Sequence, residues 1–540
     1  MKRLIFSLLG LCAITLSLSA KPARRDALTL TQPDGTQLTA FLNGDEFYHY
    51  YTNAEGQMLQ CDDRGFYQAV PLPSEAELTA RRNRNPRRIA QQQQVGGELN
   101  LAPRGLIILV NFTDLKFTTD IAEIDSMING LNYTRNYSYK YWGHTYNITS
   151  SGSARQYFHD NSRGLYNPVF DVVGPVELSN KYSYYGGNNA QGYDKHAEDM
   201  IKEACELVDD EVDFTLYDND DDDGNKVDFV YVIYAGYSES DGAGKDYIWP
   251  HNYHLSYSGI TCKVDGKRVD NYACSSELSY TSKQHDGIGT FCHEFSHVLG
   301  LPDLYATNDA THKTMGAWDI LDYGPYNNDG NTPPGYSAYE RFYMGWLTPT
   351  LINSECNVQL PALHTSNAAV ILTETGEHNL VGLSPNPTTF FILENRQNKS
   401  WDEYLPGHGM LVTKIKYSKS KWSGNTVNNT KSSMGVDIIE ADGEAPTYST
   451  TSNNGYIGKP GDAYPKGADA FTDLEPYQVT DIQEVDGIIY FKVNGGGEEI
   501  ILAVDDVEQP TRSITKKIIR NGQILIERDG TYYDLLGNRQ

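Results

Sequence analysis

Long apolar runs are missing from this 540-residue sequence: none after the first twenty residues approaches the roughly 20 residues that a membrane-spanning helix needs. The one early stretch, Leu4 to Leu18, follows Met1-Lys2-Arg3 and ends in Ser19-Ala20. A basic start, a short apolar core and a small residue before the cut are typical of a secretory signal peptide. Residues 1–20 are therefore predicted to direct export, and the mature protein is predicted to be secreted or held at the cell surface, with no membrane span.

Cysteine is also scarce, with seven in the whole chain, one of them inside the predicted signal peptide. The others are scattered and form no C-x-x-C pair, which excludes a disulfide-dense scaffold and gives no support to a zinc site built from thiolates. One or two disulfides remain open, with Cys262 and Cys274 the closest pair in the sequence.

Basic residues are few relative to acidic ones: 44 Lys and Arg face 71 Asp and Glu, for a net charge of −27. A protein that grips phosphates needs a basic surface, so nucleic-acid binding is excluded as a function class. Part of the acid is clustered, which suits extracellular calcium.

The most informative segment is Phe291 to Asp303, which contains the pattern H-E-x-x-H-x-x-G-x-x-D. On a helix, His293 and His297 leave the same face one turn apart, at the spacing that holds one zinc ion with two nitrogens. Glu294 lies beside them, where it can take a proton from a zinc-bound water. Gly300 favours the end of the helix, so that Asp303 can return to the metal as a third ligand.

One alternative for the third ligand is Glu340. Thermolysin-like zinc sites take a Glu from a later helix, and Glu340 lies in such a segment, Tyr336 to Tyr343. A helix-surface ion pair with a base such as Arg341 also accounts for it. Gly300 favours Asp303, because a helix that continued would have no use for a glycine there.

Composition divides the chain into several parts, so a multidomain fold is predicted. Residues 21–102 read as a small β-rich segment. Residues 103–348 read as an α/β (α+β) catalytic domain, with buried strands at Gly105–Phe112 and Val227–Tyr234. Residues 349–494 read as an all-β region, and 495–540 as a C-terminal tail with Gly495–Gly497 as a hinge.

A basic run, Arg81 to Arg88, is followed by Gln91 to Gln94 and has no apolar periodicity. This composition is typical of a linker. An exposed, arginine-rich linker in an exported acidic protein predicts cleavage by a trypsin-like activating protease, which would make residues 21–102 a removable pro-segment. A solvated linker that is never cut is the alternative.

Several motifs resemble the immune inhibitor A family of secreted bacterial metallopeptidases, of the metzincin type. They are His293–Tyr305, Trp318–Gly324, Pro333–Ala338, Glu394–Gln397, Leu405–Gly409 and Glu46–Thr52. The resemblance runs from about Leu28 to Val493. It implies a metzincin-like catalytic domain, His293, His297 and Asp303 as zinc ligands, and Glu294 as general base.

Two residues qualify this resemblance. Metzincins place a methionine in a tight turn under the zinc, and Leu321 stands at that position here, where it can fill the same apolar floor. Tyr323 matches a tyrosine that some metzincins carry near the metal, and its hydroxyl would stabilise the oxyanion of the tetrahedral intermediate. An ordinary packed tyrosine is the alternative, in a chain with 39 of them.

An acidic run predicts a calcium site, because carboxylates on alternate residues around a glycine suit a cation with six to eight oxygen ligands. Two registers remain open, and a strand follows where an EF-hand would have a helix. A solvated acidic turn is the alternative. The candidate ligands are Asp218, Asp220, Asp221, Asp222, Asp223 and Asp228.

Cys61, in Gln60-Cys61-Asp62-Asp63, is a candidate zymogen switch, since a thiolate there could occupy the open zinc position. Asp62 or Asp63 could do the same. The overall prediction is a monomeric, exported zinc endopeptidase that acts on proteins or peptides and is made as a zymogen. The rival is a surface-binding protein with a decayed enzyme core. The segment from Lys516 resembles C-terminal sorting segments of exported bacterial proteins.

Overall fold

The computed structural model describes residues 20–46, 48–62, 64–74, 76–78, 102–189, 192–219, 225–308, 312–444 and 457–502, and three strands beyond them. The predicted signal peptide up to residue 19 and the arginine-rich linker lie outside these residues. The chain forms two compact units, Met1–Leu502 and Ala503–Gln540. Among the described residues, no helix has the length and apolar character needed to cross a membrane.

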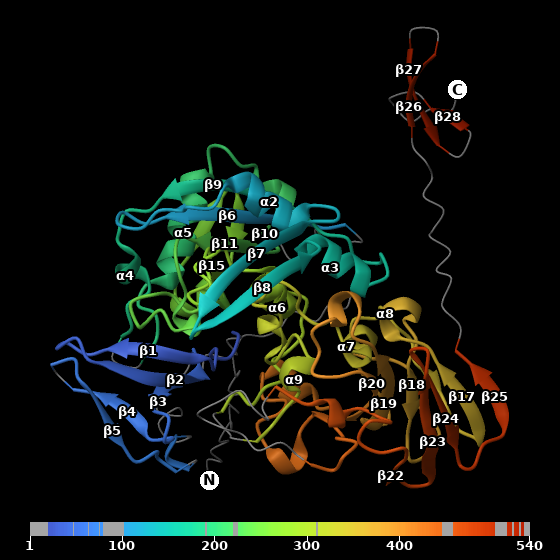
Figure 1. Ribbon diagram of the computed structural model, residues 1–540. Coiled ribbons are helices and arrows are strands. Elements are labelled where there is room, and N and C mark those ends of the chain that lie inside the picture. Colours follow the sequence, from blue (N-terminus) through green and yellow to red (C-terminus); the bar gives the residue numbers. More distant parts are fainter. Residues whose placement is uncertain are drawn as a thin grey trace, which may run out of the picture. The chain divides into compact units, whose positions relative to one another are not determined.

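A five-stranded antiparallel sheet comes first in the chain (blue in Figure 1). Each strand pairs with the next in sequence, as the alternating segments and Gly turns between residues 28 and 65 predict. The strands are β1 (Ala27–Thr31), β2 (Gln37–Asp45), β3 (Tyr48–Thr52), β4 (Met58–Cys61) and β5 (Tyr67–Val70).

An α/β domain follows, built on a sheet with the strand order β12-β15-β11-β6-β9. The neighbours β15, β11, β6 and β9 run parallel, and β12 closes one edge antiparallel to β15. The apolar runs predicted as buried strands at residues 105–112 and 227–234 supply the central strands, although the second strand begins only at Val230. The strands are β6 (Arg104–Asn111), β9 (Val169–Glu177), β11 (Val230–Tyr234), β12 (His251–His254) and β15 (Asn271–Ser276).

Helices cover both faces of this sheet (Figure 1). Side chains alternate along β6, so Leu106 and Ile108 pack with helix α5 (Ala197–Val208), whereas Ile107 and Leu109 pack with helix α6 (Ile288–Val298). Helices α2 (Ile121–Asn129) and α3 (Ala154–Asn161) contribute to the same core as α6. The H-E-x-x-H motif is therefore on a helix that is packed against the central sheet.

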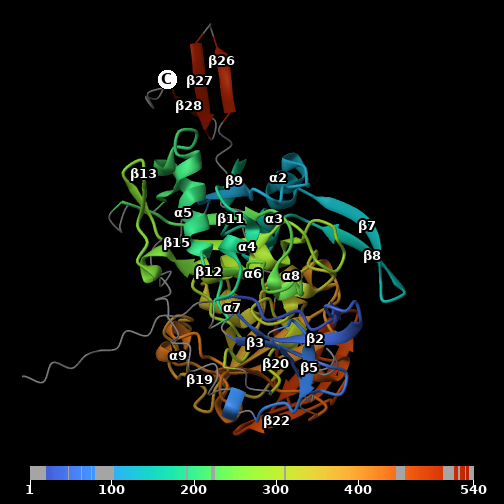
Figure 2. The same cartoon turned by 90° about the vertical axis from the view of Figure 1, so that its left-hand side faces the viewer.

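A two-stranded ribbon, β7 (Thr134–Tyr141) and β8 (His144–Ser151), extends from the α/β domain (Figure 2) and contacts β1. At its tip, the Trp142 indole N–H donates to the Ala27 carbonyl at 3.0 Å, and the Tyr141 hydroxyl donates to the same carbonyl. The ribbon thus ties the α/β domain to the start of the N-terminal sheet.

The region after residue 349 consists of two five-stranded sheets, as the predicted all-β character requires. Their orders are β16-β18-β19-β20-β21 and β22-β23-β24-β17-β25. The bounds are β16 (Thr350–Leu351), β17 (Cys356–Leu360), β18 (Val370–Leu372), β19 (Thr389–Arg396), β20 (Gly409–Lys416), β21 (Val436–Ile438), β22 (Phe471–Leu474), β23 (Tyr477–Val485), β24 (Ile488–Val493) and β25 (Glu498–Ile501).

The predicted boundary at 494/495 is wrong. Strand β25 pairs in parallel with β17, so the β region continues to Leu502. Gly495 and Gly496 have φ near +90° and form a tight connection from β24 to β25, where a hinge was predicted. Beyond residue 502, the described strands β26 (Lys516–Arg520), β27 (Gln523–Arg528) and β28 (Thr531–Tyr533) form one antiparallel sheet.

Candidate metal centre and active site

Helix α6 ends where the sequence predicts it to end. Leu299 is its last residue in the right-handed region, and Gly300 follows with φ of 90°. The Leu301 amide donates back to the Ser296 carbonyl at 3.1 Å, which closes the helix end around the left-handed glycine. The chain then reverses, and Asp303 returns to the helix face that carries the two histidines.

Each histidine is oriented by a backbone carbonyl. Nδ1 of His293 lies 2.7 Å from the Ile320 oxygen, and Nδ1 of His297 lies 2.8 Å from the Leu301 oxygen. Because each carbonyl accepts a hydrogen bond from Nδ1–H, Nε2 of each ring carries no proton. The lone pair of each Nε2 points toward Nε2 of the other histidine. Burial lowers the pKa of His293, which favours the neutral imidazole that metals bind.

Asp303 completes a triangle of donor atoms. Its Oδ1 lies 3.3 Å from Nε2 of His293 and 3.3 Å from Nε2 of His297, and the two nitrogens are 3.1 Å apart. Burial alone would raise the pKa of Asp303, but His297 and His293 hold it at about 2. All three residues are almost fully buried.

This triangle fits a zinc ion. Ligands 2.0–2.2 Å from a tetrahedral zinc lie about 3.3 Å from one another, close to the three separations found here. Oδ1 of Asp303 accepts no hydrogen bond, although it is fully buried, as expected of an atom whose partner is a metal. Glu294 also lies within the His-Glu-His group, but Asp303 is the better third ligand because its oxygen contacts both nitrogens.

A fourth residue, Asn425, holds Asp303 from the β region. The Asn425 amide donates to Oδ2 of Asp303 at 2.5 Å and its oxygen accepts from the Asp303 backbone N–H at 2.7 Å. This double contact leaves Oδ1 directed at the histidines. Nothing in the local sequence around Asn425 signals this role, because it lies 122 positions from Asp303.

We expect Asn425→Ala to weaken zinc binding by about 10- to 100-fold, since a residue that orients a metal ligand has an effect of this size. Competition with a fluorescent chelator measures the affinity directly. Asn429→Ala is the matched control, because Asn429 lies in the same loop and bonds Thr307 rather than Asp303. Equal affinities of the two variants would contradict the role of Asn425.

Glu294 is fully buried beside the triangle. Its Oε1 accepts a hydrogen bond from the Lys21 backbone N–H at 3.2 Å, and its Oε2 has no hydrogen-bond partner. Burial raises the pKa of Glu294 to about 8. A carboxyl group with a pKa near neutrality both accepts and returns a proton readily, as a general base that becomes a general acid must do.

The contact from Lys21 belongs to an extended segment, Ala20 to Arg25, whose residues are all buried. Catalytic-domain side chains bind its backbone on both sides of Lys21: Trp249 Nε1 donates to the Lys21 carbonyl and the Tyr305 hydroxyl to the Ala20 carbonyl. The Tyr326 hydroxyl donates to the Pro22 carbonyl at 2.7 Å. The start of the predicted pro-segment therefore lies directly against Glu294.

The remaining predicted site residues lie as follows. Leu321 is fully buried next to Ile320, and its carbonyl accepts from the Leu304 N–H at 2.8 Å. Tyr323 is buried and its hydroxyl accepts from the Arg25 N–H at 3.4 Å, so it faces the N-terminal segment. The Glu340 carboxylate accepts hydrogen bonds from Ser337, in a capping box at the start of helix α7 (Ala338–Tyr343), and not from residues of the metal triangle.

Cys61 is a wrong prediction for the latency contact. The structure places it at the exposed end of β4, where its thiol contacts the Asp62 carbonyl. The Asp62 carboxylate bonds the turn at Arg64 and Phe66, and residue 63 lies outside the described part. The contact with the site is made by backbone at Lys21, which a search for thiols and carboxylates cannot find.

The predicted calcium ligands are only partly described. Asp218 forms an ion pair with Lys267, and the Asp228 carboxylate accepts from the Asn219 side chain at 2.6 Å. Asp220, Asp221, Asp222 and Asp223 lie outside the described residues.

The closest pair of cysteines in the sequence forms no disulfide in the structure. Cys262 and Cys274 are free cysteines on different strands, β13 (Cys262–Val264) and β15.

A known protein family matches the part of the chain that contains the metal triangle. Residues 91–347 match the family described as immune inhibitor A peptidase M6, catalytic domain. Over this range the chain is similar to an immune inhibitor A-type catalytic domain. This confirms the family that the sequence motifs resemble, and the matched range ends at Leu347, one residue before the predicted end of the catalytic domain.

Two curated relatives extend the comparison. The chain is 26% identical to immune inhibitor A of Bacillus thuringiensis subsp. alesti over 283 residues, 47% of this chain and 41% of that protein. It is 26% identical to the pre-pro-metalloprotease PrtV of Vibrio cholerae serotype O1 (strain M66-2) over 253 residues, 42% of this chain and 27% of that protein. The matched part thus spans less than half of either relative.

Proposed function

We propose that this protein is a secreted, zinc-dependent endopeptidase that hydrolyses peptide bonds of extracellular proteins and is made as a zymogen. The observation that carries the proposal is the triangle of His293, His297 and Asp303 with Glu294 beside it, in a domain of a metallopeptidase family. Zinc bound there would lower the pKa of a water and polarise the scissile carbonyl.

Each residue of the site has a defined role in this proposal. His293, His297 and Asp303 hold the metal, and Asn425 fixes the orientation of Asp303. Glu294 takes the proton of the attacking water at its carboxylate and returns it to the leaving amine. Tyr323 is proposed to stabilise the oxyanion, and Leu321 to support the metal ligands from below as the counterpart of the metzincin methionine.

Latency is proposed to come from the segment Lys21–Arg25. Lys21 bonds the carboxylate of the general base, and the segment fills the space that a peptide substrate needs to approach it. Apolar contacts support it, since Ala20, Ala23, Leu28 and Leu42 pack with Trp249. The printed name of the Vibrio relative, a pre-pro-metalloprotease, is consistent with a precursor of this kind.

Cleavage of the predicted signal peptide would add a positive charge to the contact with Glu294. Cleavage after Ala20 would convert the Lys21 backbone nitrogen, 3.2 Å from Oε1 of Glu294, into an α-amino group. With an ordinary pKa of about 7.7–8.0, that group is largely protonated at neutral pH and pairs with a carboxylate. Latency would then use the new chain terminus. A second cut, in the Arg81–Arg88 linker, would free the segment.

Metal removal tests the proposal. After linker cleavage by a trypsin-like protease, the protein is expected to cleave a casein substrate. A chelator should abolish this activity and zinc should restore it, because the three ligands leave one position open for a water. Zinc per chain is measured alongside. A chain that binds no zinc, or proteolysis that resists chelation, would refute the function and favour the rival surface-binding protein.

The docking of the N-terminal segment is expected to depend on pH through His49. His49 Nε2 lies 3.1 Å from Oε1 of Glu239, and the ring stacks on Trp249 at 4.9 Å. Burial lowers the pKa of His49, but Glu239 more than offsets this, so the pKa is raised. Protonated His49 therefore stabilises the docked segment fully at a pH below its unperturbed pKa of 6.5. This stabilisation is lost as the pH rises through the raised pKa that His49 has in the docked state.

The intact precursor is therefore expected to become several-fold easier to activate as the pH rises from 6 to 9. The measurement is the rate at which activity develops at a fixed dose of activating protease, corrected for that protease's own pH profile. His49→Gln keeps a donor for Glu239 but cannot ionise, and its rate should not follow this trend. A wild-type rate that falls with pH would contradict the role of His49.

Calcium binding by the acidic run at residues 218–228 remains a prediction. Calcium is expected to raise the midpoint of thermal unfolding, because a bound ion stabilises the folded state by mass action. No change at millimolar calcium would exclude the site.

A further inference from the structure

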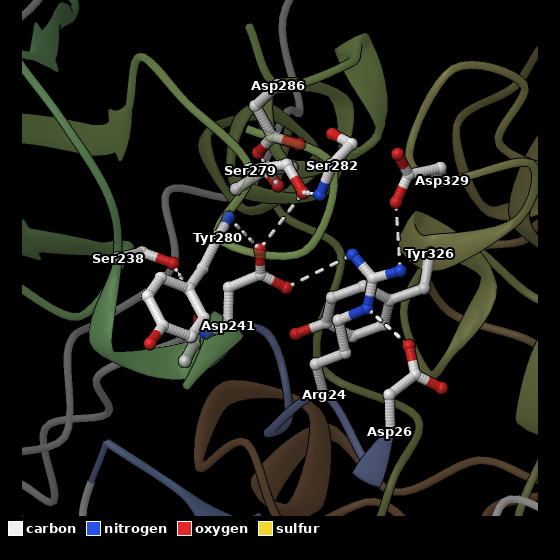
Figure 3. Close-up of polar contacts among 12 residues, drawn as sticks. Arg24, Asp26, Ser238, Asp241, Ser279, Tyr280, Ser282, Asp286, Tyr326 and Asp329 are labelled. Carbon is white, nitrogen blue, oxygen red and sulfur yellow. Dashed lines mark hydrogen bonds and ion pairs between the residues drawn. The ribbon is translucent and has the colours of Figure 1, made fainter. Parts of the chain in front are cut away.

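The N-terminal segment continues past Glu294 along the catalytic domain. Lys21 lies at Glu294, and the backbone that follows it contacts Tyr326 and Tyr323 through Pro22 and Arg25. Arg24, three positions along, is buried, and its guanidinium contacts three carboxylates (Figure 3). The distances are 2.6 Å to Asp26, 3.2 Å to Asp241 and 2.8 Å to Asp329. Asp26 belongs to the same segment, whereas Asp241 and Asp329 belong to the catalytic domain.

The two catalytic-domain carboxylates are held in place independently of Arg24. Oδ2 of Asp241 accepts from the Tyr280 backbone N–H at 2.6 Å and from the Ser279 hydroxyl at 3.2 Å, as Figure 3 shows. Oδ2 of Asp329 accepts from the Tyr137 hydroxyl at 3.0 Å. Each aspartate thus has one oxygen anchored by the domain and presents the other, Oδ1, to the guanidinium.

An aromatic ring completes the pocket. The Arg24 guanidinium lies over the Tyr326 ring at 5.7 Å, and the Lys21 ammonium lies over the same ring at 4.8 Å. Both distances are within the range of cation–π attraction. The Lys21 ammonium also donates to Thr290 Oγ1, whose hydroxyl bonds Asp286. Both cations of the segment thus lie against groups of the catalytic domain that favour positive charge.

Removal of the pro-segment would leave Asp241 and Asp329 without their cation. With the segment docked, their side chains are 6% and 2% exposed, so a ligand that takes its place buries them again, at a cost unless it supplies the opposite charge. A substrate arginine offers the same fork of donors and would remove that cost, whereas a neutral side chain would not.

We propose that Asp241, Asp329 and Tyr326 form a specificity subsite that binds an arginine side chain of the substrate. The inference rests on the proposed peptidase function and adds its substrate class: proteins with a basic residue at one fixed distance from the cleaved bond. Asp241 and Asp329 supply the charge, and Tyr326 supplies the flat wall. The pro-segment occupies the subsite as a substrate mimic.

The test uses the full chain carrying Arg24→Ala, whose own arginine no longer fills the pocket, loaded with zinc. Two labelled peptides are compared: Ala-Lys-Pro-Ala-Arg-Arg-Asp, the sequence of residues 20–26, and the same peptide with citrulline at its fifth position. Citrulline keeps the shape of arginine and removes the charge. Fluorescence anisotropy, measured with Glu294→Gln added to prevent cleavage, is expected to show about 100-fold tighter binding of the arginine peptide.

Asp241→Asn with Asp329→Asn should erase this difference. Asp171→Asn should not, because Asp171 lies on β9, at the sheet edge opposite β12, and pairs with Arg104 of β6. Equal binding of the two peptides, or no binding of either, overturns the subsite.

A positional peptide library separates this inference from the function on which it rests. The zinc-loaded Arg24→Ala chain is expected to prefer arginine or lysine at one position, and the double aspartate variant to lose that preference. Hydrolysis without any basic preference overturns the subsite and leaves the function standing. Absence of hydrolysis, together with selective binding of the arginine peptide, refutes the function and leaves the subsite standing.

Discussion

Replacing Glu294 by glutamine is expected to lower kcat/KM for peptide hydrolysis by at least about 10²- to 10⁴-fold while leaving zinc bound. Glutamine has nearly the same shape as glutamate and can keep a contact with the Lys21 backbone. It cannot accept a proton from water at neutral pH. The three proposed metal ligands, His293, His297 and Asp303, are unchanged in this variant, so metal binding and proton transfer are separated.

The measurement pairs zinc content per chain with the rate of hydrolysis after linker cleavage. Glu340→Gln is the matched control, because Glu340 is equally buried and the sequence leaves it open as an alternative third ligand. Glutamine can maintain the capping box with Ser337, so Glu340→Gln should retain both zinc and most of the activity. Loss of zinc in Glu340→Gln, or full activity in Glu294→Gln, would overturn the assignment.

Replacing Arg24 by alanine is expected to make the uncut precursor about 100-fold more active. Arg24 is the buried anchor of the N-terminal segment, and its removal leaves the carboxylates of Asp241 and Asp329 buried without a cation. Breaking a buried ion pair in this way costs about 3–5 kcal/mol, and each 1.4 kcal/mol changes an equilibrium tenfold. The released segment would no longer keep substrate from Glu294.

The activity of the uncut chain is measured with a short peptide substrate, so that only contacts close to the active site contribute to binding. Arg64→Ala is the control, since Arg64 lies in the same pro-segment but its side chain is 77% exposed and forms a surface ion pair with Asp62. An exposed pair of this kind contributes little, so Arg64→Ala should remain latent. If Arg24→Ala stays as inactive as the wild type until the linker is cut, Arg24 does not hold the zymogen closed.

The wrong predictions share a cause. The sequence favours Cys61 as the switch because thiols bind zinc, but the segment that contacts the site does so through the Lys21 backbone, 273 positions from Glu294. A backbone N–H has no signature in a sequence. The predicted domain boundary at residue 494 is wrong for a similar reason. Three glycines suggest a hinge, and only the pairing of β25 with β17 shows that the sheet continues.

The helical spacing of His293 and His297, the helix end at Gly300 and the return of Asp303 could all be predicted from thirteen consecutive residues, counted from Phe291 to Asp303. These features depend on backbone geometry within one helix and one turn, where each residue constrains its near neighbours. For the same reason, continuous apolar runs predict the central strands, and alternating apolar residues predict the all-β region.

Tertiary structure alone decided the rest. It brought Asn425 to Asp303, the Ile320 carbonyl to His293, and Asp241 and Asp329 to Arg24, all across long separations in the sequence. Such contacts depend on which faces of distant elements pack together, and a polar side chain in a loop carries no local pattern that reveals its partner. The sequence by itself therefore determined the chemistry of the metal ligands, whereas the fold determined their orientation, the segment that covers them and the charged pocket beside them.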